Sequence, residues 1–312
     1  MPFFSVVIPL YNKQAYIAET LNTVFAQTFT NFEVIVVNDG STDDGGTTVK
    51  AFNDERITYI ETVNRGVSAA RNTGITAGKG KLIAFLDADD YWLPAHLENL
   101  YNLYNNHPSS GIFVSRYYIK NPAVSNYVKP VFKNLTDDYT GIVADVFSSS
   151  LNYRVVWTSA LAVPKSVFNE LGSFKEHVTH PEDIEMWIRI ATHCTVALSN
   201  SYTAVYNYDV AGSLSKRKMA GRKIMDFTAF TEAEKNNPGL KAFLDQYRLE
   251  YAVKFKTEGD AINANTLYNQ AAAYNINLKS RLLYFLPPFV LRGLLTLKHW
   301  LHKKGFNFTV HD

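Results

Sequence analysis

The sequence predicts an α/β fold with a mainly parallel sheet, because short apolar runs alternate with longer helical patterns through its first half. The runs at residues 5–9, 33–37 and 81–86 are almost continuously apolar, as in strands that are buried on both faces. Helical patterns separate these runs at residues 13–27 and 67–77. Strands joined in this way by helices form βαβ units, and ligands bind beyond the carboxyl ends of such strands.

Further elements follow in order, with strand patterns at residues 57–61, 112–118 and 202–208 and an apolar stretch at 155–163. Pro164 and Gly172 bracket a short helix. Beyond about Ser215 the strand patterns stop and helical patterns take over. We therefore expect residues 1–215 to form one α/β domain and residues 216–312 to form a helical C-terminal region.

The overall composition excludes some classes of function. The chain of 312 residues carries 31 Lys and Arg against 29 Asp and Glu, and its net charge of +2 provides no electrostatic basis for general nucleic-acid binding. Its single cysteine, Cys194, cannot form an intramolecular disulfide, which favours a reducing compartment, and its apolar surroundings place it in the core. The first residues run into a strand pattern without a basic leader, so we expect a cytoplasmic location.

A cluster of acids directly follows one of the buried strands. The segment DADD holds Asp87, Asp89 and Asp90 immediately after the apolar run at residues 82–86. Carboxylates this close repel one another, and a Mg²⁺ or Mn²⁺ ion shared with phosphate oxygens would relieve the repulsion. The alternative is a solvated acidic turn that also caps the helix starting near Pro94.

Polar segments also follow the first two strands. PLYN, which contains Pro9 and Tyr11, follows the first strand, and NDGS, which contains Asp39, follows the second. Because Asn, Asp, Gly and Ser are common turn formers, Asp39 is compatible with a simple turn. Its carboxylate is also suited to accept a hydrogen bond from a nucleobase on which Tyr11 stacks. The joint placement of the two residues favours this second interpretation.

Arg71 lies in the helical segment NRGVSAARNTG, whose alanines and Gly74 are small enough for close approach to the sheet or to a ligand. A guanidinium group at this position is suited to bind phosphate, and the alternative is an arginine on a solvated helix face. Asn64 and Arg65, in the loop before the helix, are candidates of the same kind.

The segment HPEDIEMW opens an apolar helix with two acids, Glu182 and Asp183. Acids favour helix N-termini, and Thr179 with Glu182 fits a capping box, so capping alone explains them. A carboxylate held rigidly at a helix N-terminus that faces a cleft is also suited to act as a general base, and the sequence leaves both interpretations open. We expect Trp187 to anchor the core and Arg189 to form ion pairs or hydrogen bonds.

Taken together, these motifs resemble the family 2 inverting glycosyltransferases, which have the GT-A fold. The resemblance rests on SVVIPLYNKQAYIAETLNTVFAQTFTNFEVIVVNDGSTDD, NRGVSAARNTGI, GKLIAFLDADDYWLP and EDIEMWIRIA, which occur in that family's order and spacing across about residues 3–215. It implies a Rossmann-like, mainly parallel mixed sheet flanked by helices, with a helical extension at the C-terminus. It also makes residues 1–215 a nucleotide-sugar-binding and catalytic domain.

The resemblance also implies a role for each motif. Tyr11 and Asp39 would hold the base of a nucleoside diphosphate, usually uridine, and Arg71 would approach the nucleotide. The DADD motif would hold ribose and, through Asp89, a Mn²⁺ or Mg²⁺ ion on the diphosphate. The candidate site residues are therefore Asp183 as catalytic base, Asp89 as metal ligand, and Pro9, Tyr11, Asp39, Arg71, Asp87, Asp90 and Glu182 as substrate contacts.

The implied activity is an inverting transfer of sugar from a nucleoside-diphosphate sugar, usually a UDP-sugar, to a glycan or lipid-linked acceptor in cell-surface polysaccharide biosynthesis. The chain lacks the Gln-x-x-Arg-Trp segment of processive synthases, which favours transfer of a single sugar. Many relatives carry a His before a Gly-Ser pair, but this chain has Asp209 and Val210 in YNYDVAGSLSK, which argues against a His ligand there.

Two other functions are considered. A catalytically silent nucleotide-sugar-binding module would need the base and metal contacts but no catalytic carboxylate at Asp183. A sugar nucleotidyltransferase would need a Gly-rich, Arg-containing loop after the first strand, and PLYNKQAY lacks one.

The C-terminal region is basic, since no acid occurs between Asp260 and Asp312. A helix over residues 288–303 would carry Val290, Leu291, Leu294, Leu297 and Leu301 on one face and Arg292, Thr296, His299 and Lys303 on the other, with Lys298 between the faces. We expect peripheral membrane contact through residues 279–304, and the alternative is docking onto the catalytic domain or a second subunit of a homodimer. The apolar stretch at residues 282–301 is interrupted by prolines and charges and should not span a membrane.

Overall fold

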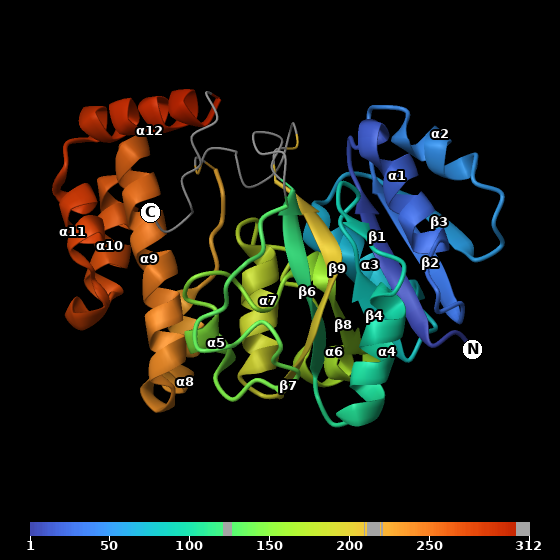
Figure 1. Cartoon of the computed structure of the whole chain (residues 1–312). Helices are drawn as coiled ribbons and strands as arrows, with labels where there is room; N and C mark the ends of the chain where they lie inside the picture. The colour runs from blue at the N-terminus through green and yellow to red at the C-terminus, as the bar shows by residue number, and fades with distance from the viewer. Residues whose placement is uncertain (121–126, 209, 211–218, 220, 304–312) are drawn as a thin grey trace.

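The computed structural model describes residues 1–120, 127–208, 210, 219 and 221–303, and within these the chain forms one nine-stranded mixed sheet flanked by helices (Figure 1). The strands are β1 (Phe4–Leu10), β2 (Phe32–Asp39), β3 (Ile57–Thr62), β4 (Leu82–Phe85), β5 (Tyr91–Trp92), β6 (Ile112–Lys120), β7 (Gly141–Ile142), β8 (Leu161–Pro164) and β9 (Val196–Asn207).

The strand order is β3-β2-β1-β4-β8-β6-β9-β5, with β7 added on β9. Strand β1 pairs in parallel with both β2 and β4, β2 pairs in parallel with β3, and β6 pairs in parallel with β9. Strands β5, β7 and β8 run antiparallel to their neighbours. The predicted α/β class with a mainly parallel mixed sheet is confirmed, and the strand order reverses direction at β1, where open sheets of this kind bind ligands.

The helices are α1 (Gln14–Phe25), α2 (Gly45–Lys50), α3 (Val67–Ala77), α4 (His96–Asn106), α5 (Val146–Ser149), α6 (Lys165–Leu171), α7 (Glu182–Ala191), α8 (Thr231–Asn236), α9 (Pro238–Glu258), α10 (Ala261–Gln270), α11 (Leu278–Phe285) and α12 (Pro288–Lys303). Their positions agree with the helical patterns of the sequence. Helix α6 lies between Pro164 and Gly172, as the sequence predicts.

Some sequence-based expectations need correction. The strand predicted at residues 202–208 is longer than expected, since β9 begins at Val196. Its pairing with β6 shifts register near Ser115, so buried and exposed side chains do not alternate regularly along it and the sequence pattern hides its first part. The apolar stretch at residues 155–163 contains a 3₁₀ turn (Thr158–Ala160) before β8. Cys194 is only partly buried and packs against the edge of the core.

Close packing of α3 on β1 depends on Gly74. A Cβ atom at this position would lie 2.3 Å from Cγ1 of Val7, which is closer than side-chain atoms approach. The expected close approach of this helix to the sheet is therefore present, and it brings the buried Arg71 of α3 to the edge where β1 and β4 end.

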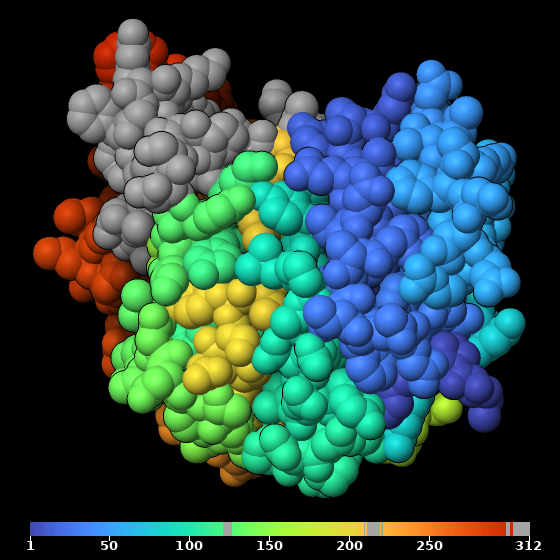
Figure 2. Space-filling view, turned by 45° about the vertical axis from the view of Figure 1, so that its right-hand side comes forward, coloured from blue at the N-terminus to red at the C-terminus, as the bar shows by residue number. Residues whose placement is uncertain are grey.

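The C-terminal helices pack against the rest of the chain through α9. The rings of Phe147 in α5 and Phe243 in α9 have centroids 5.9 Å apart, and Leu244 belongs to the same buried apolar cluster as the sheet. Because the buried core includes residues beyond position 215, the boundary between an α/β domain and a helical region at that position stays a prediction. In Figure 2, as in Figure 1, the N-terminal elements and the C-terminal helices lie on opposite flanks of the molecule.

Helix α12 lies across one end of α9 (Figure 1), where Nε of Arg292 donates to the carbonyl oxygen of Thr257 at 2.8 Å. The apolar face predicted for this helix is divided, since Leu291 is buried whereas Leu294 and Leu297 are exposed. In the part of the chain that the structure describes, no helix has the length and apolar character needed to cross a membrane.

Candidate active site

A cavity of about 900 Å³ opens at the carboxyl ends of β1, β2 and β4. Its wall contains all nine residues that the resemblance assigns to the site: Pro9, Tyr11, Asp39, Arg71, Asp87, Asp89, Asp90, Glu182 and Asp183. The topology explains this gathering, because parallel strands bring the segments that follow them to one edge of the sheet. Asp183 joins from the N-terminus of α7.

The loops after β1 and β2 are tied to each other beside the cavity. The backbone N–H of Asn12 donates to Oγ of Ser41 at 3.1 Å, and Oδ1 of Asn12 accepts from the N–H of Thr42 at 2.8 Å. These bonds fix the PLYN and NDGS segments side by side, so the half-buried Tyr11 and the buried Asp39 belong to one wall of the cavity.

Asp39 does more than form a turn, because its carboxylate organises the loop before α3. Its two oxygens accept from the backbone N–H groups of Arg65 and Gly66, each at 2.8 Å. Gly66 has a φ of 93°, a left-handed conformation that favours glycine. The side chain of Arg65 pairs with Glu176 and is not part of the cavity wall, whereas Asn64 is.

Arg71 connects two of the motifs through ion pairs. Its Nη2 atom donates to Oδ1 of Asp87 at 2.8 Å, and its Nη1 atom donates to Oε1 of Glu182 at 3.0 Å. The side chain is only 4% exposed, so the alternative of a solvated helix face is wrong. Burial lowers the pKa of this guanidinium, but Asp87 and Glu182 more than offset that effect and keep it charged.

Asp89, the predicted metal ligand, has an internal cation beside it. Nζ of Lys13 lies 2.6 Å from Oδ2 of Asp89, and the two side chains are 14% and 18% exposed. Burial raises the pKa of Asp89, and Lys13 opposes that rise. Sequence reasoning missed Lys13, although it directly follows PLYN and lines the cavity.

Asp90 is almost fully buried and serves the structure of the site. Its carboxylate accepts from Oγ of Ser159 at 2.6 Å and from the backbone N–H of Asn207 at 2.9 Å, which joins the DADD segment to β9. Burial and the neighbouring carboxylates raise the pKa of Asp90 well above its usual value. The N-cap residue of α4 is Ala95, which provides no side-chain cap, and Asp90 bonds to Ser159 and Asn207 instead, so the capping alternative for DADD is wrong.

Asp183 is held as an ionised carboxylate at the start of α7. Its Oδ2 atom accepts from Nη1 of Arg154 at 3.2 Å and from Oγ1 of Thr158 at 3.3 Å, and its Oδ1 atom accepts from the N–H of Ile184 at 2.8 Å. Burial alone would raise the pKa of Asp183, but Arg154 and then Arg71 outweigh it, so the pKa lies below the usual value.

The predicted capping box at this helix is wrong. The N-cap residue of α7 is Pro181, which provides no side-chain cap, and the hydroxyl of Thr179 instead exchanges hydrogen bonds with the backbone of Lys223. Glu182 extends to Arg71 rather than back to the helix terminus. Its placement is therefore explained by an ion pair across the site and not by capping.

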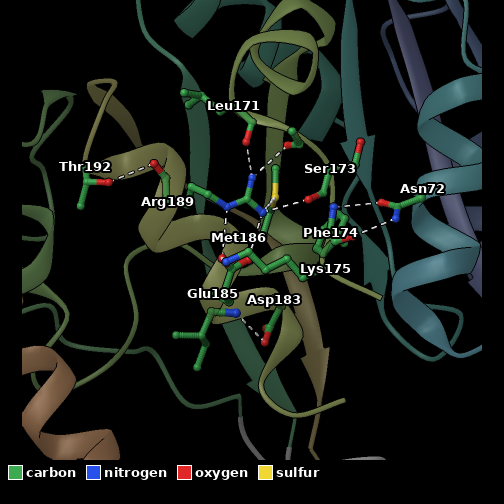
Figure 3. A network of polar contacts seen from close by, with 12 residues as sticks. Asn72, Leu171, Ser173, Phe174, Lys175, Asp183, Glu185, Met186, Arg189 and Thr192 are labelled. Carbon is green, nitrogen blue, oxygen red and sulfur yellow. Dashed lines mark hydrogen bonds and ion pairs between the residues drawn. The ribbon is translucent and has the colours of Figure 1, made fainter. Parts of the chain in front are cut away.

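A network around Arg189 fixes the position of α7 (Figure 3). The guanidinium donates to the carboxylate of Glu185 at 3.0 and 3.1 Å and to the carbonyl oxygens of Leu171, Gly172 and Ser173 at the end of α6. The predicted structural role of Arg189 is confirmed. The network holds the helix that carries Asp183 against its neighbour.

The far wall of the cavity comes largely from residues that no sequence motif marked. Arg154 stacks on Trp157 at 4.2 Å from the ring centroid, and Tyr206 lies 4.3 Å from the same ring. Helix α9 adds Phe243, Gln246, Tyr247, Glu250, Tyr251 and Lys254 to this wall. None of these residues belongs to a recognisable functional motif, so only the tertiary structure identifies them.

The donor atoms fit a metal ion only in combination with a phosphate ligand. Across the described residues, no three or more His, Cys, Asp or Glu side chains are grouped so as to hold a metal ion. Mg²⁺-type sites take one or two carboxylates and complete their coordination with phosphate oxygens and water. The carboxylate of Asp89, which pairs with Lys13 here, is a donor of this kind. Asp209 and residues 211–218, where a His ligand was considered, lie outside the described residues.

The sheet topology defines a GT-A type of fold, with the acids beyond β4 and the carboxylate at the start of α7 lining its cavity. The chain belongs to glycosyl transferase family 2, whose family model matches residues 5–168. It is 31% identical over 191 residues to the uncharacterized glycosyltransferase RP339 of Rickettsia prowazekii, covering 60% of this chain and 58% of that protein.

Other curated relatives differ in how much of their length the chain covers. The chain is 38% identical over 143 residues to glycosyltransferase GlyA of Streptococcus pneumoniae, covering 45% of this chain but only 20% of that protein. It is 28% identical over 225 residues to the UDP-Glc:alpha-D-GlcNAc-diphosphoundecaprenol beta-1,3-glucosyltransferase WfaP of Escherichia coli, covering 70% of this chain and 82% of that protein.

Solved structures share the fold. A crystal structure of S. aureus TarS residues 1–349 in complex with UDP-GlcNAc has a TM-score of 0.59 and 18% identity, with 86% of this chain and 91% of that chain covered. A second structure of TarS has a TM-score of 0.64 and 20% identity over 88% of this chain and 50% of that chain. At these identities the likeness establishes the GT-A fold.

Proposed function

We propose that the protein transfers a single sugar from a UDP-sugar to a hydroxyl of a glycan or lipid-linked acceptor, with inversion at the anomeric carbon, in cell-surface polysaccharide biosynthesis. The observation that carries the proposal is the position of Asp183, an ionised carboxylate in the same cavity wall as the NDGS and DADD segments. WfaP, by its name, transfers glucose from UDP-Glc to a diphosphoundecaprenol-linked sugar, and this supports the donor and acceptor classes.

The donor binds at the carboxyl ends of β1, β2 and β4. Tyr11, beside Pro9, stacks on the base, and the rigidly held carboxylate of Asp39 accepts a hydrogen bond from a base N–H. Asp87 binds the ribose, and Arg71, which Asp87 orients, supplies positive charge on the phosphate side. Glu182 and Asp90 support these residues. Glu182 orients Arg71, and Asp90 fixes the end of β9.

The reaction proceeds by direct displacement. The carboxylate of Asp183 takes the proton from the acceptor hydroxyl, whose oxygen attacks the anomeric carbon from the face opposite the leaving diphosphate. An α-linked donor thus gives a β-linked product. Asp89 would hold a Mn²⁺ or Mg²⁺ ion, whose charge would stabilise the leaving diphosphate.

Replacing Asp183 with Asn tests the base. An amide cannot accept the proton, so we expect kcat to fall by about 10²–10⁴-fold while the affinity for the nucleotide donor changes little. Initial rates and isothermal titration with the donor give the two quantities. The control is Asp44→Asn, a change at an exposed acid outside the cavity. Unchanged turnover in the Asp183 variant would remove this residue from the base role.

The same variant separates the alternative functions. A silent binding module shows no turnover before or after the substitution and keeps its nucleotide affinity. A nucleotidyltransferase would form a nucleotide sugar rather than consume one. The loop after β1, tied through Asn12 to Ser41 and Thr42, lacks the Gly-rich sequence that such an enzyme requires.

We also place the protein on the cytoplasmic face of a membrane, held by an apolar surface on α11 and α12. Its exposed apolar side chains are Leu278, Leu282, Phe285, Phe289, Leu294, Leu295, Leu297 and Trp300. Lys279, Arg281 and Arg292 lie among them, and no acid occurs between residues 260 and 312. Apolar area beside positive charge complements an anionic lipid surface, where a lipid-linked acceptor would be found. Binding to anionic vesicles is the direct test, and formation of a homodimer through this surface is the outcome that would oppose it.

A further inference from the structure

The acids of the DADD segment are compensated within the protein itself. Asp87 pairs with Arg71, and Asp90 accepts hydrogen bonds at the interior. Asp89 pairs with Lys13, whose Nζ atom is buried and has no other hydrogen-bond partner among the described protein groups. An ammonium group has three N–H donors, so the cavity holds positive charge with unused donors directly beside the proposed metal ligand.

A lysine ammonium and a divalent cation repel each other strongly when both lie against the same carboxylate oxygen. At 2.6 Å from Oδ2 of Asp89, Nζ of Lys13 stands where a metal ion would coordinate. The lysine stem is flexible, so the ammonium is able to move by rotation if another anion nearby offers it a partner. A diphosphate bound in the same cavity is such an anion.

We propose that Lys13 is the resident cation of Asp89 in the nucleotide-free protein and moves onto the diphosphate when nucleotide and metal bind. This inference rests on the proposed donor class, a nucleoside diphosphate with a divalent metal. Lys13 therefore opposes metal binding in the empty site and supports it once the diphosphate is present. As a result, nucleotide and metal bind as a coupled pair, and each raises the affinity for the other by the same factor.

The test is a Mn²⁺ titration of the purified full chain, with and without UDP, followed by the electron paramagnetic resonance signal of free Mn²⁺. For Lys13→Met without UDP we expect Mn²⁺ to bind at least about fivefold more tightly than to the wild type, because its competitor is gone. In this variant, the factor by which UDP increases the Mn²⁺ affinity should be at least about fivefold smaller than in the wild type. Unchanged or weaker Mn²⁺ binding in this variant without UDP would overturn the proposal.

Three further variants make the result specific. Lys13→Arg keeps a cation and should retain the nucleotide dependence of Mn²⁺ binding. Asp89→Asn combined with Lys13→Met should lose the tighter Mn²⁺ binding expected for Lys13→Met alone, since the carboxylate is then absent. Lys50→Met removes a lysine from an ion pair with Glu61 that lies outside the cavity and should bind Mn²⁺ as the wild type does.

The outcome is independent of sugar transfer. If the Lys13 effect on Mn²⁺ binding is found but no sugar is transferred from any UDP-sugar, the exchange of Lys13 stands and the proposed function fails. If sugar is transferred and Lys13→Met leaves Mn²⁺ binding unchanged, the proposed function stands and the exchange is rejected. Failure of every variant to bind Mn²⁺ with UDP present would reject the exchange as well.

Discussion

Arg154 controls the charge of the proposed catalytic base. It donates to Asp183 from a partly buried position and stacks on Trp157, so its guanidinium is fixed in place. Around Asp183 the other charged or titratable groups include Arg71, Glu182 and His180, and Tyr247 and Tyr251 of α9. Because Arg154 is the largest of the influences that lower the pKa of Asp183, it is the residue that keeps the base ionised as the pH falls.

Replacing Arg154 with Met should move the acid limb of the pH–rate profile. In the wild type the depressed pKa of Asp183 keeps the base ionised from neutral pH down through the usual aspartate range, and activity is lost only below it. Without the guanidinium the pKa rises, so the acid limb of kcat should move up by about one pH unit or more. Arg154→Lys, which keeps a positive charge, should move it less. An acid limb unchanged in Arg154→Met would show that this residue does not set the charge of Asp183.

The crowded acids after β4 illustrate what a local motif leaves open. A DADD segment predicts that a cation must relieve the repulsion, and we expected a metal ion to do so. In the structure, Arg71 and Lys13 relieve it for Asp87 and Asp89. Both cations come from other segments of the chain, so no rule applied to the DADD segment alone identifies them.

Among the secondary-structure elements, α3 shows how packing places a charged side chain. The helix lies against β1 where Gly74 faces Val7, and it carries Arg71 one turn earlier on the chain. The small side chains of this segment in the sequence indicate a close approach, and the structure shows that the sheet is the partner. The close packing of α3 on β1 therefore sets the position of the Arg71 guanidinium.

Substituting Gly74 with Ala should destabilise the protein by about 1–3 kcal/mol, since the added methyl would lie 2.3 Å from Cγ1 of Val7 and the helix must move away. Chemical denaturation measures the change. The matched control is Gly293→Ala in α12, where an added Cβ meets nothing within 4 Å and the higher helix propensity of Ala should be neutral or stabilising. Equal stability of the Gly74 variant and the wild type would contradict the packing argument.

At the scale of the whole molecule, the cavity lies between the sheet edge and α9, so the C-terminal region contributes directly to the site. Its inner side supplies Tyr247 and Tyr251 to the cavity wall, and its outer helices carry the exposed apolar surface. A chain arranged in this way is suited to receive an acceptor at the membrane and present it to Asp183. The family model matches residues 5–168 and does not include this region.

Neutralising charge on the apolar surface should weaken membrane binding. For Lys279→Gln combined with Arg281→Gln we expect about 1 kcal/mol less binding energy per charge removed, measured by co-sedimentation with vesicles that contain phosphatidylserine. High salt should reduce wild-type binding in the same way. Lys50→Gln, a lysine outside this surface, should bind as the wild type does. Equal binding to neutral and anionic vesicles, or a stable dimer with no vesicle binding, would contradict the proposed surface.

The sequence by itself determined the fold class and the set of motifs that meet at one sheet edge. Both follow from short-range patterns, because apolar runs of this kind form buried strands and the segments after parallel strands share an edge. Only the tertiary structure decided which charges face one another. The pairing of Lys13 with Asp89, Arg71 with Glu182 and Arg154 with Asp183 joins segments that are far apart in the chain. Ion pairs act over a few ångströms in space, and folding sets those distances.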